Sequence, residues 1–556
     1  MRVMPRTPRI SGAPLRSLAR LARTRVGGKA LYQALRAELR IDGLNQLPER
    51  MRGDVPLDTK PLQARPPRAG QDAGLPVMSR PWGGSGTSGQ ALTAAYREGK
   101  VSPVQIVERA LASARELGAH TPSVGPILEY AADATREAEL SAARYREGKA
   151  LGPLDGVPCA IKEQTAVRGL ARRGGTSFLH GTEAADATCV ARLRAAGALI
   201  LGTTAMTEYG MSPLGQNASR TMPRNPHATD HVAGGSSTGS GVAVATGIAA
   251  FAIGADGGGS IRIPSAMNGV FGIKPTWGRV SRAGDMSTGT VSHVGPLASS
   301  PLDLARVLEI IGAPDDADGQ TLGAPPIGPG SLERALGRGV RGLRIGVDEN
   351  EWASTAPAIA KAGREALAAL EREGATLVTV DIAHARYAAS IGYLSIGVEA
   401  FAAVRADWQE HADEMTHDLQ VSFASLARVS ASDYVNAQRL RAGVRREVRR
   451  VLGDVDLLGL PTTATTATRV TDAQMQSGFV DASALDAMCR FAFLANLTGL
   501  PAASMPVGRD ENGLPIGFQL VGDAWDEATV LAAAAHLERI EVARVERPKF
   551  SVRLLD

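Results

Sequence analysis

The stretch from Val232 to Ser265 reads VAGGSSTGSG, then VAVATGIAAFAIGA, then DGGGSIRIPS. Two glycine–serine loops flank a run of small apolar residues that is long enough for a buried helix and a short strand. Glycines allow backbone N–H groups to approach a ligand closely, and a serine hydroxyl becomes a nucleophile when a base takes its proton. We therefore expect the loops to meet at one nucleophilic site, with Ser236 on the first and Ser260 on the second.

The pattern on either side of this stretch predicts an α/β fold. Residues 157–161 are apolar and bracketed by glycine and proline, which indicates a buried strand that ends at Lys162. A helix over about residues 187–196 and a strand over 198–202 follow, and helix–strand alternation returns beyond residue 340. Such alternation is typical of helices packed on a mixed or parallel sheet.

Residues 385–450 are mostly helical and polar in pattern, and we expect them to form a cap over one face. Strand patterns return from Asp454 and lead to a final helix. No repeat of fixed period is present, and no clean linker follows residue 83. The chain is therefore predicted to hold one large domain over residues 83–556, preceded by an appendage over residues 1–82.

The appendage combines an arginine-rich helical arm with a proline-rich linker that ends at GGSGTSG, residues 83–89. Two apolar helix faces are predicted on either side of Gly27 and Gly28, one from Leu15, Leu18, Leu21 and Ala22 and one from Leu31, Ala34, Leu35 and Leu39. We expect the arm to pack on the body or on a second subunit of a homodimer. Contact with an anionic lipid surface is the less favoured alternative.

Chemistry at the two loops requires a base, and Lys162 is the best candidate. A lysine accepts a proton only when neutral, and burial favours the neutral form. Ser236 would pass the proton of Ser260 to Lys162. Three consecutive glycines, Gly257 to Gly259, would point successive N–H groups at one spot and form an oxyanion hole.

Other interpretations of these residues are weaker. GSSTG, residues 235–239, matches a nucleophile elbow centred on Ser237, but the elbow needs a strand immediately before it. GGSSTGSG is similar to a phosphate loop, yet no lysine follows Gly239. Both loops could be plain turns between core elements. His227 and His231 lie in a predicted loop, which disfavours a metal pair there.

Six stretches together resemble the amidase signature family. They are GPLDGVPCAIKE, GGSSTGSG, DGGGSIRIPS, GIKPTWGRVS, NLTGLPAASMPVG and GLPIGFQLVG, which run in this order from residue 152 to residue 522. Each stretch alone is a modest signal, but the ordered set is specific. The separation of Ser236 and Ser260 also agrees with the family.

The resemblance implies that Ser260 is the acyl-accepting nucleophile, Ser236 a bridging serine after a cis peptide bond, and Lys162 the base. Backbone amides of Gly257, Gly258, Gly259 and Ser260 would form the oxyanion hole, with Asp256, Arg262 and Ser237 as supporting residues. It also implies an α/β/α sandwich around a twisted mixed sheet, and no cofactor or metal.

The sequence departs from the family pattern at four positions. Glu163 stands where aspartate is commoner, Thr238 where glycine is usual, Gly257 where isoleucine, leucine or threonine is usual, and Ser292 where aspartate is frequent. None of these positions is one of the three proposed catalytic residues. We expect them to affect substrate preference rather than catalysis.

Composition limits the partners. The formal net charge is only +4, and the excess of arginine is local to the first 37 residues, so no nucleic-acid partner is expected. The three cysteines lie far apart without ligand spacing, which is consistent with a reducing compartment. No secretory signal is evident, and a transit peptide is disfavoured. We expect a cytoplasmic, bacterial protein.

The function expected is hydrolysis of a linear carboxylic amide of small size through a serine acyl-enzyme. The alternatives are the amidase subunit of a glutamine-dependent tRNA amidotransferase, and an esterase or aryl acylamidase of the same fold. Residues 207–213 and the 385–450 helices are expected to shape the pocket. Tyr387, Tyr393, Phe401 and Trp408 are candidates for an apolar acyl pocket.

Overall fold

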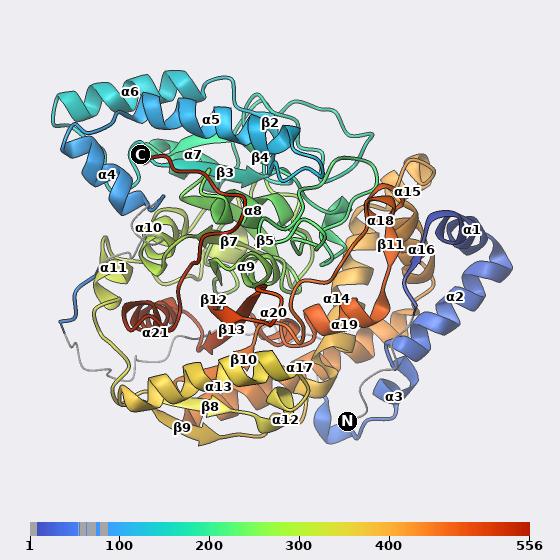
Figure 1. Ribbon diagram of the computed structural model, residues 1–556. Helices are drawn as coiled ribbons and strands as arrows, with labels where there is room; N and C mark the ends of the chain where they lie inside the picture. Colours follow the sequence, from blue (N-terminus) through green and yellow to red (C-terminus); the bar gives the residue numbers. More distant parts are fainter. Residues whose placement is uncertain (1–7, 54, 56–62, 64–73, 78–86, 556) are drawn as a thin grey trace.

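The computed structural model describes residues 8–53, 55, 63, 74–77 and 87–555 (Figure 1). Most of the predicted linker lies outside these residues, including Pro56, Pro61, Pro66, Pro67 and Pro81. The division at residue 82 therefore stays a prediction.

A mixed sheet occupies the centre of the molecule. Within the described ranges, eleven strands form it in the order β2-β4-β3-β5-β7-β6-β12-β13-β10-β8-β9. Their bounds are β2 Ile127–Tyr130, β3 Pro158–Lys162, β4 Leu199–Thr204, β5 Phe251–Asp256, β6 Phe271–Lys274, β7 His293–Ala298, β8 Arg344–Val347, β9 Thr376–Thr379, β10 Leu457–Pro461, β12 Ala502–Arg509 and β13 Pro515–Gly522. Strand β3 runs parallel to both β4 and β5, whereas the central strands from β5 to β13 pair antiparallel.

Helices cover both faces of the sheet. Their bounds are α4 Gly89–Arg97, α5 Pro103–Ala119, α6 Ala134–Arg146, α7 Thr188–Ala195, α8 Thr238–Ala245, α9 Arg262–Asn268, α10 Pro301–Ile311, α11 Ser331–Ala335, α12 Glu349–Trp352, α13 Pro357–Arg372 and α21 Glu527–Arg539. On β13, a side chain at Gly517 would meet Ala266 of α9, whereas one at Gly522 would meet Val530 of α21. These positions differ by an odd number of residues, so α9 and α21 lie on opposite faces.

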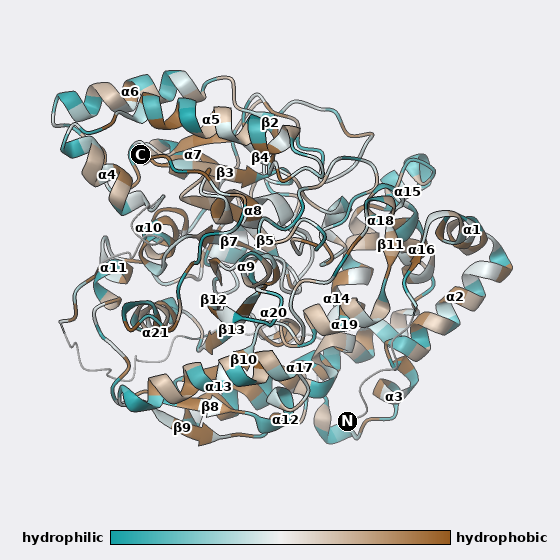
Figure 2. Ribbon diagram, viewed as in Figure 1, coloured by the Kyte–Doolittle hydropathy of each residue, from teal (hydrophilic) through white to brown (hydrophobic). Residues whose placement is uncertain are grey.

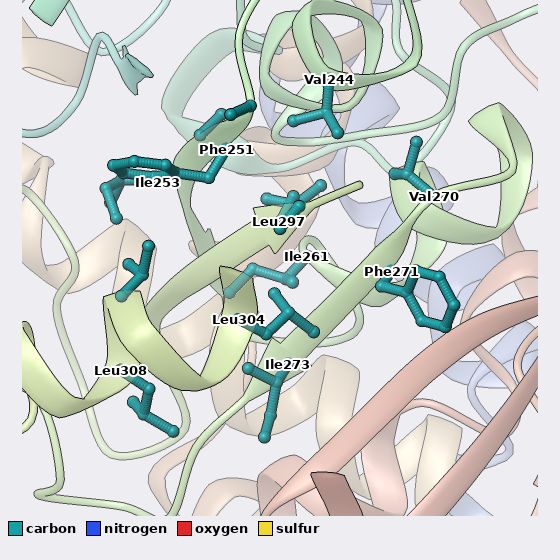
Figure 3. Packing of buried hydrophobic residues seen from close by; sticks show 14 of the residues in the cluster. Val244, Phe251, Ile253, Ile261, Val270, Phe271, Ile273, Leu297, Leu304 and Leu308 are labelled. Carbon is teal, nitrogen blue, oxygen red and sulfur yellow. The ribbon is translucent and has the colours of Figure 1, made fainter. Parts of the chain in front are cut away.

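The central core fills the space between these layers. Figure 3 shows Val244 of α8 on one side of the strands and Leu304 of α10 on the other, with Phe251, Leu297 and Phe271 between them. The predicted α/β/α sandwich is therefore confirmed. Strand β2 was not anticipated, because its four residues lie between two helices.

The predicted helical cap is present. It comprises α14 Ala385–Ala403, α15 Arg405–His411, α16 His417–Leu426 and α17 Ala431–Asp454, followed by α18 Asp472–Ser477, α19 Ala482–Cys489 and α20 Phe493–Thr498. Helices α14 and α17 pack together and both contact α20. In Figure 2 strands β3, β8 and β9 are brown, whereas outer helices such as α2 and α6 have teal segments.

Residues 8–53 form an arm that packs on the cap (Figure 1). Its elements are β1 Ile10–Ser11, α1 Gly12–Ala22, α2 Arg25–Glu38 and α3 Ile41–Asn45, and β1 pairs with β11 Phe479–Val480. The predicted apolar faces are partly wrong, because Leu21 is 51% exposed and Ala34 is also exposed. Gly27 and Gly28 lie inside α2, where a side chain at Gly27 would strike the carbonyl oxygen of Leu21.

None of the described helices is by itself long and apolar enough to cross a membrane. Helices α14 and α15 are long and apolar enough only when they are taken together, and they meet at a bend of 64°.

Candidate active site

Three separate segments bring the predicted site residues together. Lys162 is the last residue of β3, Ser236 precedes α8, and Ser260 lies between β5 and α9. Because β3 and β5 are adjacent and parallel, their carboxyl ends meet at the same edge of the sheet. All three residues line one cavity of about 270 Å³.

A side-chain hydrogen bond joins Lys162 to Ser236, and a backbone hydrogen bond joins the loop of Ser236 to the loop of Ser260. The Nζ atom of Lys162 lies 2.7 Å from the Oγ atom of Ser236, and these residues are only 1% and 2% exposed. The peptide bond between Gly235 and Ser236 is cis. The backbone N–H of Ser237 donates to the carbonyl oxygen of Ser260 at 3.3 Å, which fixes the first loop against the second.

Burial controls the charge of Lys162. It lowers the pKa of the ammonium group from 10.5 to about 7, although the nearby carboxylates of Asp285, Asp256 and Glu163 oppose the shift. A substantial fraction of Lys162 is therefore neutral near pH 7 and able to accept a proton.

The glycine loop lies beside the cavity, which Gly257 and Ser260 line. The N–H of Gly259 donates to the Asp256 carboxylate at 2.8 Å. In the described part of the chain, no internal acceptor is found for the N–H groups of Gly257, Gly258 or Ser260. A side chain at Gly258 would lie 2.5 Å from the ring of Phe493. Gly258 is therefore needed for close packing of the loop. The prediction that the Gly259 N–H is an oxyanion donor is wrong, because Asp256 accepts its hydrogen bond, whereas the other three predicted donors stay a prediction.

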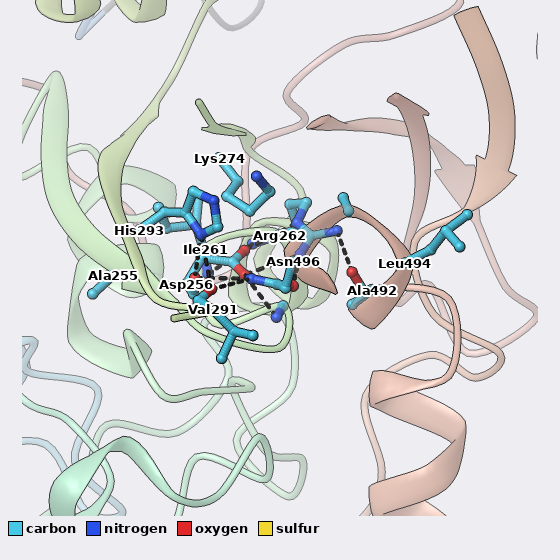
Figure 4. A network of polar contacts seen from close by, with 12 residues as sticks. Ala255, Asp256, Ile261, Arg262, Lys274, Val291, His293, Ala492, Leu494 and Asn496 are labelled. Carbon is cyan, nitrogen blue, oxygen red and sulfur yellow. Dashed lines mark hydrogen bonds and ion pairs between the residues drawn. The ribbon is translucent and has the colours of Figure 1, made fainter. Parts of the chain in front are cut away.

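A buried ion pair supports this loop (Figure 4). Asp256 and Arg262 are fully buried and pair at 2.9 Å. Asp256 also accepts from the N–H groups of Gly259 and Ile261 and from the amide of Asn496. Burial alone would raise the pKa of Asp256, but Arg262 holds it well below its usual range.

Ser237 has a supporting position. Its hydroxyl is fully buried and donates to the carbonyl oxygen of Ala255 in β5 at 3.2 Å. No strand precedes it directly, since residues 222–237 form a loop. The nucleophile elbow is therefore absent at GSSTG.

The cavity wall includes the two predicted segments, residues 207–213 and the cap helices, but not the predicted aromatic side chains. It is lined by Met206, Tyr209, Met211, Met286, Ser292, Ile396, Ala400, Ala403, Val404 and Asp407, among others. Tyr387, Tyr393, Phe401 and Trp408 do not line it. Phe401 and Trp408 instead pack around Phe423, and Tyr393 packs on Phe493. The aromatic character of these residues alone could not show whether they line the cavity or pack in the hydrophobic core.

Two of the sequence departures have structural partners. A side chain at Gly257 would lie 2.5 Å from the Cδ1 atom of Ile396 in the cap, so Ile396 occupies that space. Glu163 is buried and pairs with Arg220 at 2.8 Å. Burial raises the pKa of Glu163 to about 7 despite Arg220.

No cluster of three or more histidine, cysteine, aspartate or glutamate side chains suited to a metal ion occurs in the described part of the chain. His227 lies with Nε2 3.0 Å from the Asn268 carbonyl oxygen, and His231 contacts Asp230 through Nδ1. The two predicted loop histidines therefore each have a protein partner.

Comparison with known proteins assigns the chain to a family. The sequence matches the Amidase family over residues 108–531. The chain belongs to the amidase family. A fatty acid amide hydrolase of Medicago truncatula is 34% identical over 463 residues, which cover 82% of this chain and 76% of that protein.

Two further amidase relatives cover a similar part of the chain. A glutamyl-tRNA(Gln) amidotransferase subunit of Chloroflexus aurantiacus is 33% identical over 493 residues, covering 83% of this chain and 98% of that protein. The native peptide amidase of Stenotrophomonas maltophilia has a solved structure that is 28% identical, with a TM-score of 0.72 over 84% of this chain and 99% of that one. This amidase is therefore an amide-hydrolysing enzyme.

Proposed function

We propose that the enzyme hydrolyses a carboxylic amide through an acyl-enzyme on Ser260, with Ser236 as proton bridge and Lys162 as base. The observation that carries the proposal is the buried Lys162 amine 2.7 Å from the Ser236 hydroxyl, in the cavity that Ser260 also lines. A neutral amine in hydrogen-bond contact with a hydroxyl is the arrangement that a general base requires.

The first half-reaction transfers the acyl group. Neutral Lys162 takes the Ser236 proton while Ser236 takes the Ser260 proton, and the Ser260 Oγ atom attacks the amide carbon. The N–H groups of Gly257, Gly258 and Ser260 would stabilise the oxyanion, and one such donor is typically worth about 3 kcal/mol. The C–N bond then breaks, and the relay returns its proton to the departing amine.

The second half-reaction releases the acid. Water enters the cavity, gives a proton to the same relay and attacks the acyl carbon of the Ser260 ester. The ester bond breaks, Ser260 recovers its proton through Ser236, and a carboxylic acid leaves. The same steps would cleave an ester, so competing amide and ester substrates are needed to separate an amidase from an esterase.

The cavity wall favours a substrate with an apolar portion. Methionine, isoleucine, alanine and valine side chains form much of it, and apolar surface removed from water stabilises binding. The 34% identity to a fatty acid amide hydrolase is consistent with this preference. The proposed substrate class is therefore a small amide with an aliphatic chain next to the scissile bond.

The test is Ser260→Ala, assayed with a series of aliphatic amides for amine release. We expect turnover to fall at least about 10³-fold, with unchanged circular dichroism and thermal midpoint. Ser432→Ala, which removes an exposed hydroxyl from α17, is the matched control and should be fully active. Full activity of the Ser260 variant would refute the proposal.

The second candidate is the amidase subunit of a glutamine-dependent tRNA amidotransferase, which the 33% identity to a protein of that kind favours. That function predicts glutamine hydrolysis and copurification with partner subunits. Amide hydrolysis by the isolated chain, with no activity on glutamine, would exclude it.

A further inference from the structure

The cap presents a continuous stripe of residues to the cavity. Ile396, Ala400 and Ala403 recur at spacings of four and three, which places them on one face of α14, and Asp407 continues the cavity wall on α15 beyond a bend of 64°. The stripe begins at the nucleophile loop, where Ile396 lies against Gly257. It ends at the carboxylate of Asp407, up to about 16 Å further along the helix path.

The charge in the cavity is confined to its two ends. Among the described residues that line it, only Lys162 and Asp407 have side chains of a formally charged type. Lys162 must be neutral to act as the proposed base. The remaining charge is the negative carboxylate of Asp407, separated from the nucleophile by apolar wall.

A neighbouring tyrosine orients Asp407. The Tyr209 hydroxyl donates to the Oδ2 atom of Asp407 at 2.5 Å. The Oδ1 atom has no partner within the part of the chain that the structure describes, and Asp407 is neither fully buried nor fully exposed. One carboxylate oxygen is thus fixed and the other is available to a ligand in the cavity.

We propose that Asp407 is a specificity-determining residue that selects amides carrying a positively charged group at the far end of an apolar spacer. The ligand would place its amide at Ser260, its aliphatic spacer along Ile396, Ala400 and Ala403, and an ammonium group beside the Oδ1 atom of Asp407. This inference rests on the proposed function and adds the charge of the substrate to it.

The alternative is that the pair between Tyr209 and Asp407 only fastens α15 to the loop around residues 207–211. Two variants separate these roles. Asp407→Asn removes the charge and keeps an acceptor for the Tyr209 hydroxyl, whereas Tyr209→Phe removes the hydrogen bond and keeps the charge. A fastening role predicts equal effects on charged and neutral substrates in both variants.

The experiment measures kcat/KM for isosteric substrates that differ only in a terminal ammonium or methyl group. One pair is 10-aminodecanoyl and undecanoyl p-nitroanilide, whose chain is long enough to extend from Ser260 toward Asp407, and a second pair carries the same difference on the amine side. We expect the wild-type enzyme to prefer the cationic member of at least one pair about two- to fivefold, less so at high salt. Asp407→Asn should abolish this preference, Asp407→Lys should invert it, and Tyr209→Phe should retain it.

Glu410→Gln is the matched control, because it removes the same charge from the exposed side of α15. It should leave the preference unchanged. Ser260-dependent hydrolysis without preference in either pair would overturn the role of Asp407 and leave the proposed function intact. Loss of preference in Tyr209→Phe with retention in Asp407→Asn would also overturn it.

Discussion

Lys162 is buried beside Ser236, and burial lowers its pKa to about 7. Because the base must be unprotonated, kcat/KM should rise as the pH increases through about 7 and reach a plateau above it. Asp285 raises the pKa of Lys162, so Asp285→Asn should move the acidic limb to lower pH. A pH–rate profile measures both effects.

The control for that profile is Asp316→Asn, which removes an exposed carboxylate from the same part of the chain and should not move the limb. If the acidic limb of the profile does not move in Asp285→Asn, the limb arises from the titration of a group other than Lys162.

Asp256 stabilises the nucleophile loop as the partner of the fully buried Arg262. Asp256→Asn leaves that guanidinium without a counter-charge, and breaking a buried pair typically costs about 3–5 kcal/mol. We expect this loss in urea denaturation at neutral pH, together with reduced kcat. Because the folded pKa of Asp256 lies below its unfolded value, the ionic contribution exists above the unfolded pKa and is lost as the pH falls toward the folded one.

Glu349→Gln is the matched control for Asp256, because Glu349 pairs with Arg364 at the surface. Its effect on the free energy of unfolding should stay within about 0.5 kcal/mol. Equal effects of the two substitutions would contradict a special role for the buried pair.

At the scale of elements, α14 of the cap closes directly on the glycine loop. Ile396 occupies the space that a side chain at Gly257 would need. Gly257→Val should displace the loop and lower kcat/KM about 10²-fold, since small misplacements at a reacting centre have effects of that size. Adding Ile396→Ala should restore at least part of this loss.

The single variant Ile396→Ala is the control for the double variant. It should keep kcat and raise KM, because it removes apolar surface from the cavity wall. If the double variant is no more active than Gly257→Val, steric conflict between helix and loop is not the cause of the defect.

Local pattern predicted most of the elements that position the site. The apolar segment ending at Lys162 is β3, and the run after Ser236 is a helix followed by a strand, because glycines and prolines mark the ends of these segments. The exposure of Leu21 was not predictable, since it depends on where α1 packs on the cap. The pattern of apolar residues within a segment decides whether it forms a helix or a strand. Whether a given side chain is buried depends on the elements that pack against that segment.

The walls of the site were harder to predict than its centre. Phe401 and Trp408 could line a pocket or a core, and their contacts with Phe423 decided the outcome. Asp407 and Tyr209 were not singled out, because nothing in the sequence shows that α15 meets the loop at residue 209. Their pairing depends on tertiary packing between segments nearly 200 residues apart.

At the scale of the whole molecule, the arm is connected to the cavity through the cap. Helices α1 and α2 pack on α16. Thr416, just before α16, donates through its N–H and hydroxyl to buried Glu208. Glu208 directly precedes Tyr209 in the chain, and the Tyr209 side chain lines the cavity. A contiguous path of packed elements therefore leads from the arm to the substrate site.

The arm is fastened at Asp433 of α17, which accepts from Arg36 at 2.6 Å and from Asn45 at 2.9 Å. Burial alone would raise the pKa of Asp433, but these donors and Ser430 lower it. The double variant Arg36→Ala/Asn45→Ala removes both contacts from the arm side. We expect it to lower the free energy of unfolding by about 1–3 kcal/mol.

Loosening the arm should also change substrate binding, because the loop at residues 207–211 loses support from α16. The same double variant should raise KM severalfold and leave the acidic limb of the pH–rate profile in place, since Lys162 lies in the sheet and not in the cap. Arg450→Ala, an exposed change on the same helix, should alter neither quantity. Reduced stability with unchanged KM would show that the arm stabilises the cap without reaching the cavity, and unchanged stability would show that Asp433 does not fasten it.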